Sequence, residues 1–404
     1  MAKTLVYEMY PIAWESLPKM TEHLMAVRQL GVDYVWLAPL YPSPRCDHGY
    51  DVSDYRAIDQ RFGTMQDFEQ FIRTAHALGI KVLMDLVLNH TSVEHEWFKK
   101  FPEVYCWRDQ DLPGWRNLFD HGSAWAPGSH GYYLHLFHKE QADLKWFFSN
   151  GEINAWLVHE FQKIVQFWLS RGVDGFRLDV PQAINKDIYS EQLKFEELLF
   201  GQDSVKVINA IFNDCTARLL TKSHQPPFLI MECLDPTFGE IVNFYANTTP
   251  VNFCLNISIK DAIKGGFTEL SLKVDEATID HNLMLDLESH DSPRFTSRSG
   301  LSHADILDLM FGSDAKGICL YQGQELGLLN PSRDQLPDAT MVFLDAETKM
   351  KFENGVKLDT LRPDSRANAR VPYPTATRDA QMAQADSAFW QTAAAIHVWK
   401  GDIS

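Results

Sequence analysis

Short runs of apolar, mostly β-forming residues recur along the chain at intervals that leave room for a helix between them. Eight such runs begin at Thr4, Tyr34, Lys81, Gly175, Phe228, Val251, Leu283 and Gly317. Their apolar residues are largely continuous and do not alternate with polar ones. This pattern is typical of parallel strands that are buried on both faces.

The segments between most of these runs carry apolar residues at helical spacing. Residues 19–31 (KMTEHLMAVRQLG) and 65–79 (MQDFEQFIRTAHALG) are two examples, and each ends at a glycine suited to a helix C′ position. Eight strand–helix units predict an α/β fold, a closed (β/α)8 TIM barrel. The alternative is an open doubly wound sheet, which would normally show a glycine-rich phosphate turn after the first strand. The sequence there, EMYPIAWES, has no GxGxxG, so we favour the barrel.

Two long intervals interrupt the strand–helix rhythm. Residues 91–150 are rich in Trp, Tyr, Gly and Pro where a single crossover helix would be expected, and they predict an irregular subdomain inserted after the third strand. The barrel would then comprise residues 1–90 and 151–404. The second part includes a long irregular stretch, about 330–374, and a helix-like segment near the C-terminus.

The composition indicates a globular protein with a substantial core. Of its 404 residues 45% are hydrophobic, and the formal net charge of -17 opposes binding to nucleic acid or to anionic lipid. No run of eighteen uncharged apolar residues occurs, and the apolar run near the N-terminus is too short for a secretory signal. We therefore expect no membrane association and a cytoplasmic location. The six cysteines are scattered, without a CxxC pair, and we interpret them as reduced.

Polar residues gather where the predicted strands end. These residues are Asp85, Asn89 and His90 after the third run, Arg177 and Asp179 in the fourth, Glu232 in the fifth, and His290 and Asp291 after the seventh. In a barrel these ends meet at one mouth, where active sites of this fold lie. A lone carboxylate there is most simply a structural ion pair, but three on separate strands raise one another's pKa and favour a function.

The chemistry that needs paired carboxylates, an arginine, histidines and many aromatics is glycoside cleavage. One carboxylate attacks the anomeric carbon while a second, protonated, delivers a proton to the leaving oxygen. Aromatic faces can bind the apolar sides of sugar rings. The sequence shows no phosphate loop, and His90 and His95 do not form the HExxH arrangement of a metal-dependent hydrolase.

Five motifs resemble the α-amylase family of retaining glycosidases, glycoside hydrolase family 13. DLVLNH, GFRLDV, MECL and SHD look like its four conserved regions, in order, and QADLKW (141–146) resembles its additional region. The resemblance extends from about residue 4 to 372 and implies a (β/α)8 barrel with a subdomain after the third strand. It agrees with the fold predicted from periodicity.

The resemblance also implies residue roles. Asp179 would be the nucleophile, Glu232 the general acid and then base, and Asp291 would hold sugar hydroxyls and stabilise the oxocarbenium-like transition state. Arg177 would keep Asp179 ionised and oriented, and His90 and His290 would donate hydrogen bonds to sugar hydroxyls. Asp85 suits an internal polar contact that supports Arg177. No cofactor is implied.

Two further segments resemble the α-glucosidase branch of the family. In DHGYDVSDY, Asp51 would grip the terminal glucose and Tyr50 would stack on it, and in RANARVPYP, Arg370 would pair with Asp51 and close the far end of the pocket. Such a pair implies exo-action on short α-glucans or isomalto-oligosaccharides. Val180, directly after the nucleophile, resembles the α-1,6-preferring oligo-1,6-glucosidases.

Several features depart from the family pattern, and several readings stay open. Residues 10–20 have one acidic residue and predict no calcium site, and the β-sandwich that usually follows the barrel in this family is not apparent.

The alternative function is a transferase or isomerase of the same family, acting on trehalose or sucrose. A non-catalytic binding subunit is a third hypothesis, which the three carboxylates oppose. The sequence does not indicate the oligomeric state.

Overall fold

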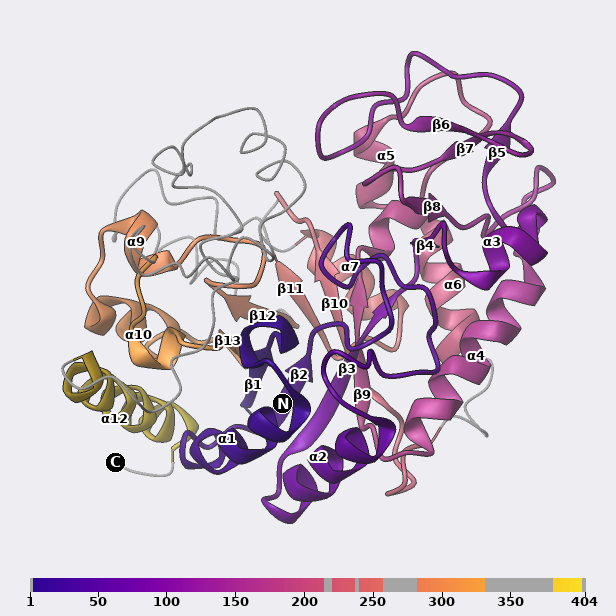
Figure 1. The fold of residues 1–404 in the computed structure, drawn as a ribbon. Coiled ribbons are helices and arrows are strands. Elements are labelled where there is room, and N and C mark those ends of the chain that lie inside the picture. The colour runs from indigo at the N-terminus through magenta and orange to yellow at the C-terminus, as the bar shows by residue number, and fades with distance from the viewer. Residues whose placement is uncertain (1–2, 214–219, 237–239, 257–281, 331–380, 402–404) are drawn as a thin grey trace, which may run out of the picture.

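Eight parallel strands close into a barrel, as the sequence predicts (Figure 1). A computed structural model describes residues 3–213, 220–236, 240–256, 282–330 and 381–401. The barrel strands are β1 (Thr4–Met9), β2 (Tyr34–Leu37), β3 (Lys81–Val87), β9 (Gly175–Asp179), β10 (Phe228–Cys233), β11 (Phe253–Asn256), β12 (Leu283–Asp286) and β13 (Gly317–Tyr321). They pair in the order β1-β13-β12-β11-β10-β9-β3-β2. Every one of the eight predicted runs supplies one strand.

Helices surround the barrel and cover its outer face. They are α1 (Leu17–Gln29), α2 (Met65–Ala77), α4 (Ala155–Leu169), α5 (Phe195–Leu199), α6 (Gln202–Phe212), α7 (Glu240–Thr248), α9 (Phe295–Ser299), α10 (His303–Phe311) and α12 (Gln381–Lys400), with 3-10 turns η1 (Pro11–Trp14), η3 (Pro181–Ile184) and η6 (Gln324–Leu326). Ser16 and Thr64 cap the first turns of α1 and α2 with their side chains. Gly31 and Gly79 follow these helices at φ +75, the left-handed conformation expected after a helix end.

The inside of the barrel changes from apolar to charged along the strands. One cluster of apolar side chains, one or two from most strands, fills its lower part: Val6, Trp36, Leu83, Ile230, Phe253, Leu255, Met284 and Cys319. Because side chains alternate with period two, the residue two positions after Val6, Leu83 and Ile230 points the same way. Those residues are Glu8, Asp85 and Glu232. The carboxyl end of the barrel therefore receives carboxylates directly above a packed apolar layer.

The interval between β3 and α4 has its own small sheets. It contains β4 (His90–Ser92), α3 (Glu96–Lys100), η2 (Pro102–Val104), β5 (Trp107–Arg108), β6 (Trp125–Gly128), β7 (Gly131–Leu134) and β8 (Gln141–Asp143). β4 pairs with β8, and β5, β7 and β6 form a three-stranded antiparallel sheet. Trp115 and Trp125 pack in a core of this segment that also takes up Ala183 and Ile188 after β9. In Figure 1 these sheets lie above the carboxyl ends of β3 and β9, over the predicted site.

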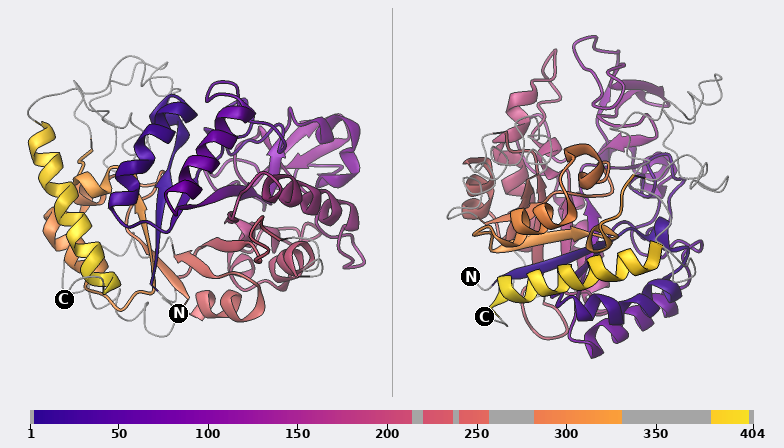
Figure 2. Two further views of the ribbon diagram at one scale, coloured as in Figure 1. Left: turned by 90° about the horizontal axis from the view of Figure 1, so that it is seen from below. Right: turned by 90° about the vertical axis from the view of Figure 1, so that its left-hand side faces the viewer.

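The chain returns to the barrel near its C-terminus through α12, the helix expected from the sequence. Figure 2 shows α12 beside α1 and α10, and Lys400 Nζ donates to Gly31 O at 2.8 Å. Within the described ranges no helix is long and apolar enough to cross a membrane. The predicted irregular stretch at 330–374 falls, from residue 331 onward, outside the described residues.

Candidate active site

Arg177 is the centre of a buried charge cluster at the end of β9. Its Nη1 donates to Asp179 Oδ1 at 2.5 Å and to Asp85 Oδ1 at 3.0 Å, and its Nη2 donates to Glu232 Oε2 at 2.8 Å. The register of the barrel creates this meeting, because Arg177 pairs with Asp85 on β3 and with Ile230 on β10. The predicted support of Arg177 by Asp85 is confirmed, and one guanidinium orients two of the three carboxylates predicted to be catalytic, Asp179 and Glu232.

The close approach of β9 and β10 depends on a glycine at the start of β9. A Cβ on Gly175 would lie 1.8 Å from Phe228 O, a distance that no side chain could adopt. Gly175 is followed two residues later by Arg177 on the same face. The backbone of Val180, next to Asp179, also donates to Glu232 Oε2 at 3.1 Å. The two strands thus hold their carboxylates through both side-chain and backbone donors.

Burial dominates the electrostatics of this cluster. Burial raises the pKa of Asp179; the Arg177 guanidinium opposes this rise, while Glu232 and Asp85 add to it, and the net direction is upward. Burial also raises the pKa of Asp85 to about 6, against the lowering effect of Arg177. The sequence predicted that Arg177 keeps Asp179 ionised. The guanidinium does act in that direction, but three carboxyls share its one charge, and the pKa values of Asp179 and Asp85 both remain above those of exposed aspartates.

His290 lies beside the cluster between two aromatic rings. Its ring stacks on Tyr10 at 5.3 Å and on Tyr50 at 5.2 Å between centroids. Its Nδ1 is 2.5 Å from Glu8 Oε1 and its Nε2 is 3.2 Å from Asp291 Oδ2. Burial lowers the pKa of His290, but Asp291 and Glu8 raise it more, to about 9. His290 is therefore a cation at neutral pH, held in place by charge and by stacking.

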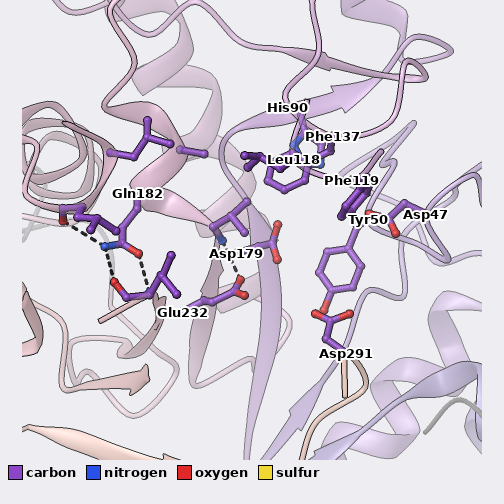
Figure 3. Close-up of a pocket in the computed structure, with 15 residues that line it drawn as sticks. Asp47, Tyr50, His90, Leu118, Phe119, Phe137, Asp179, Gln182, Glu232 and Asp291 are labelled. Atoms are coloured by element: carbon purple, nitrogen blue, oxygen red, sulfur yellow. Dashed lines mark hydrogen bonds between the residues drawn. The ribbon is translucent and has the colours of Figure 1, made fainter. Parts of the chain in front are cut away.

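The carboxylates open into a cavity of about 220 Å³ (Figure 3). Its lining includes the predicted residues Asp179, Glu232, Asp291, Tyr50 and His90. The remaining lining residues are Asp47, Leu118, Phe119, Phe137, Val180, Gln182, Ala183, Leu198, Leu199 and Leu234. In Figure 3, Asp47, Tyr50 and Asp291 stand on one side of Asp179, with Glu232 and Gln182 on the other.

His90 is held at the roof of the cavity by the inserted segment. Its Nε2 lies 3.0 Å from Gln141 Nε2, and the same amide donates to Asp47 Oδ2 at 3.0 Å. Burial lowers the pKa of His90 to about 4, so the imidazole is neutral. The two predicted histidines therefore differ: His90 is uncharged, whereas His290 carries a proton.

A second buried ion pair fixes the inserted segment to the barrel. Lys186 Nζ lies 3.1 Å from Asp143 Oδ2 and 2.5 Å from Asn89 Oδ1, and the lysine side chain is almost fully buried. Asn89 in turn donates to Asp143 Oδ1 at 3.1 Å. Lys186 was not identified from the sequence, where a lysine seven residues after a buried strand carries no distinguishing pattern.

The structure does not bring Asp51 into the cavity. The Asp51 side chain is fully buried and accepts from Ser43 Oγ at 2.7 Å and from Cys46 N at 2.8 Å. Asp47, four residues earlier, lines the cavity instead and was not predicted. Arg370, the predicted partner of Asp51, lies outside the described residues. The sequence did not show which of the two aspartates faces the cavity. The backbone between them takes positive φ at His48 and Gly49, so the directions of their side chains do not follow from a regular repeat.

The described residues offer no group of three or more His, Cys, Asp or Glu side chains arranged to hold a metal ion. The cysteines at 106, 233, 254 and 319 are buried and Cys46 is partly exposed, and none of these five forms a disulfide within the described part of the chain. Burial raises the pKa of the Cys106 thiol to about 12, which makes it inert.

Comparison with known proteins agrees with this geometry. Trehalose-6-phosphate hydrolase of Escherichia coli (strain K12) is 30% identical over 427 aligned residues, which cover 93% of this chain and 75% of the relative. Glucan 1,6-alpha-glucosidase of Streptococcus dysgalactiae subsp. equisimilis is also 30% identical, over 92% of this chain and 74% of the relative. The crystal structure of Bacillus licheniformis trehalose-6-phosphate hydrolase has a TM-score of 0.81 and 26% identity, covering 99% of this chain and 83% of that one.

A trehalulose synthase mutant structure shares the fold with a TM-score of 0.80, at 22% identity. The family model described as the alpha amylase catalytic domain matches residues 14–395, nearly the whole chain. With the closed barrel, the inserted segment and the carboxylates at the strand ends, these matches show that the chain belongs to the α-amylase family of glycoside hydrolases.

Proposed function

We propose that this protein is a retaining, exo-acting α-glucosidase that hydrolyses short, uncharged α-glucosides through a covalent glycosyl-enzyme. The observation that carries the proposal is the single guanidinium of Arg177, which holds Asp179 and Glu232 at the wall of one cavity. Retaining glycosidases need two carboxyls about 5 Å apart, one to attack and one to transfer a proton. A shared guanidinium keeps two carboxylates near each other without allowing them to touch.

In the first step, Asp179 attacks C1 of the glucose and Glu232 gives its proton to the glycosidic oxygen. The bond from C1 to the Asp179 oxygen forms, the bond from C1 to the leaving oxygen breaks, and an alcohol departs. The first step needs Asp179 ionised and Glu232 protonated. The Arg177 guanidinium, which donates to Asp179 Oδ1 at 2.5 Å, lowers the pKa of that carboxyl against the effect of burial and so favours the ionised nucleophile.

In the second step, Glu232 as carboxylate takes a proton from water while the water oxygen attacks C1. The C1–Asp179 bond breaks and both carboxyls return to their starting states. Positive charge develops on the sugar ring in each step, and Asp291 and Asp179 lie where negative charge would stabilise it. His290, a cation whose two ring nitrogens lie against Glu8 and Asp291, would orient Asp291 towards the sugar, and neutral His90 would donate to a sugar hydroxyl from the roof.

The charge of the cavity supports an uncharged substrate. Four of its described lining residues are acidic, namely Asp47, Asp179, Glu232 and Asp291, and among these lining residues none is lysine or arginine. A phosphorylated disaccharide, the substrate in the name of some relatives, would meet repulsion there. Glucose, with Tyr50 as a stacking face and Asp47 as a hydroxyl acceptor, fits the chemistry of this wall.

The size of the cavity supports exo-action, and one residue of its lining supports the linkage preference. A cavity of about 220 Å³ is smaller than the roughly 300–1,000 Å³ of sites for drug-sized ligands and suits one sugar ring with part of its leaving group. The α-1,6 preference depends on Val180, which lines the cavity. The roles of Asp51 and Arg370 in gripping the terminal glucose remain predictions.

Product analysis tests the proposal and separates it from the transferase or isomerase alternative. Isomaltose, panose, maltose, sucrose and trehalose would each be incubated with the protein, and released sugars and their anomeric form followed by NMR. We expect glucose, first released as the α-anomer, with isomaltose or panose preferred. Isomerised disaccharides as main products would establish the alternative, and first release of the β-anomer would exclude retention.

Two variants test the roles of the carboxylates. Asp179→Asn should lose activity by about four orders of magnitude or more without a change in melting temperature large enough to indicate unfolding. Glu232→Gln should lose activity on isomaltose but keep more on 4-nitrophenyl α-glucoside, whose leaving group needs no proton, and added azide should restore turnover. The matched control is Glu160→Gln, which replaces a carboxylate of α4 that pairs with Arg56 outside the cavity. This variant should keep full activity.

The cytoplasmic location expected from the sequence is part of this proposal. Fractionation of cells that express the chain would test it: activity in a membrane or secreted fraction would contradict it.

A further inference from the structure

One wall of the cavity is built almost entirely from aliphatic side chains. It consists of Ala183 on η3, Leu198 and Leu199 on α5, and Leu234 directly after β10. These segments follow β9 and β10, which are neighbours in the barrel, so the wall lies on the side of Glu232. Leu118 and Phe119 of the inserted segment continue the apolar surface across the roof.

The position of this wall relative to the chemistry identifies its role. Asp47, Tyr50 and Asp291 stand on the other side of Asp179 (Figure 3), where the polar groups suited to glucose are found. The proton donor must lie on the side of the departing group, because it protonates the leaving oxygen. The wall that contains Glu232 and Leu234 therefore faces the aglycone.

Two polar side chains, Glu232 and Gln182, lie beside this aliphatic wall, and the Gln182 amide is bonded to the backbone. Gln182 Nε2 donates to Leu199 O at 3.1 Å and to Leu234 O at 3.3 Å, and Gln182 Oε1 accepts from Leu234 N at 2.7 Å. Both amide hydrogens are thus used within the protein. A second sugar would place several hydroxyls against this wall with few donors or acceptors among the described residues to receive them.

We propose that the aglycone side of this site takes α-glucosides of apolar alcohols, such as alkyl or aryl glucosides, in preference to glucosides of a second sugar. The proposal rests on the α-glucosidase function proposed above and names the class of leaving group. The reaction is unchanged: C1 is transferred from the alkyl oxygen to Asp179 and then to water, and the released alcohol keeps the proton from Glu232. The aliphatic wall gains contact with an apolar chain and leaves no polar group of that chain unpaired.

The test compares glucosides whose leaving oxygens are alike. Methyl α-glucoside, n-hexyl α-glucoside and isomaltose all release a primary or methyl alcohol, so differences in kcat/KM report contacts of the aglycone more than leaving-group acidity. Glucose release should give a kcat/KM for the hexyl glucoside on the order of tenfold or more above both others. The variant Leu199→Asn should reduce the hexyl-to-methyl ratio at least fivefold, whereas Leu220→Asn, outside the cavity, should leave that ratio unchanged.

The outcomes separate this inference from the function on which it rests. Hydrolysis of all three substrates with isomaltose preferred would overturn the inference and leave the α-glucosidase function standing. Hydrolysis of none would overturn the function itself. A hexyl preference that Leu199→Asn does not change would overturn the assignment to this wall. If that variant does not fold, the wild-type series still decides, and n-hexanol should then inhibit the wild type at concentrations at which glycerol does not.

Discussion

Replacing Glu8 by glutamine isolates the charge that keeps His290 protonated. Glu8 is fully buried on β1, and its Oε1 lies 2.5 Å from His290 Nδ1. The amide has the same shape and can still accept a hydrogen bond, so the change removes charge and little else. The other groups that face the His290 ring are Asp291, Asp85 and the rings of Tyr10, Tyr50 and Trp36.

The structure gives the size of the effect. The pKa of His290 is raised from 6.5 to about 9, although burial alone would lower it, because Asp291 and Glu8 outweigh burial. This difference corresponds to about 3 kcal/mol in favour of the imidazolium in the folded protein. An opposite charge in direct contact typically shifts a pKa by about 1–3 units. Loss of Glu8 should therefore lower the pKa of His290 and remove about 1–4 kcal/mol of this preference.

The sign of the pH dependence follows from linkage. Because the pKa of His290 is higher in the folded than in the unfolded chain, its protonation stabilises the fold fully below pH 6.5, and this contribution is lost as the pH rises through about 9. The variant Glu8→Gln should thus melt at a lower temperature than the wild type at pH 6, and the difference should shrink towards pH 9.5. The alkaline limb of kcat/KM should move to lower pH in the variant.

Thermal melting and pH–rate profiles measured between pH 6 and 9.5 would check this prediction, with Glu160→Gln as a control carboxylate outside the site. A destabilisation that is the same at every pH would show that Glu8 acts through packing alone. An alkaline limb that stays in place would refute the expectation that loss of the proton from His290 lowers kcat/KM.

Three further variants address other contacts. Arg177→Lys should lower kcat/KM by about 100-fold or more, because one ammonium cannot replace a planar fork that binds three carboxylates; steady-state kinetics would show it. Lys186→Met should cost about 3–5 kcal/mol of unfolding free energy, measured by urea denaturation, because Asp143 would stay buried without its cation. Gln182→Leu should cost about 1–3 kcal/mol, because it leaves Leu234 N unpaired, and should lower kcat by displacing the turn after β10.

Each of these variants has an outcome that would contradict its reasoning. Unchanged kinetics in Arg177→Lys would mean that orientation of the carboxylates does not limit the reaction. Lys163→Met, which breaks an exposed pair with Glu160 on α4, is the control for Lys186→Met and should cost under about 1 kcal/mol. A Gln182→Leu protein as stable as the wild type would show that other donors replace the amide.

The barrel was predictable because its signal repeats. Each parallel strand is buried on both faces, so it produces a short apolar run, and eight such runs with helical intervals leave few other folds. The charged residues of the site interrupt three of these runs at the same end. Asp85, Arg177 and Glu232 could therefore be placed together from the sequence, since the carboxyl ends of parallel strands meet at one mouth.

The loops were less predictable because their conformation depends on contacts distant in sequence. Asp47 and Asp51 stand four residues apart, and Gln141 of the inserted segment orients the one that lines the cavity. Glu8 was not identified either, although it follows the same period-two rule as Asp85. It lies inside an apolar run, where a single glutamate has no partner visible in the sequence, and its partner His290 is 282 residues away.

The cluster around Arg177 is hard to explain by stability alone. Replacing a buried ion pair by well-packed apolar residues is often neutral or stabilising, because desolvation of the charges offsets their attraction. Here Asp85, Asp179 and Glu232 share one guanidinium, so even the best arrangement leaves negative charge unbalanced in a buried place. The layer directly below, with Val6, Leu83 and Ile230, shows that the same strands pack apolar side chains where no chemistry is needed. A barrel that holds Asp179 and Glu232 at the cavity wall on one shared guanidinium accepts a cost in stability that proton transfer to and from a bound sugar explains.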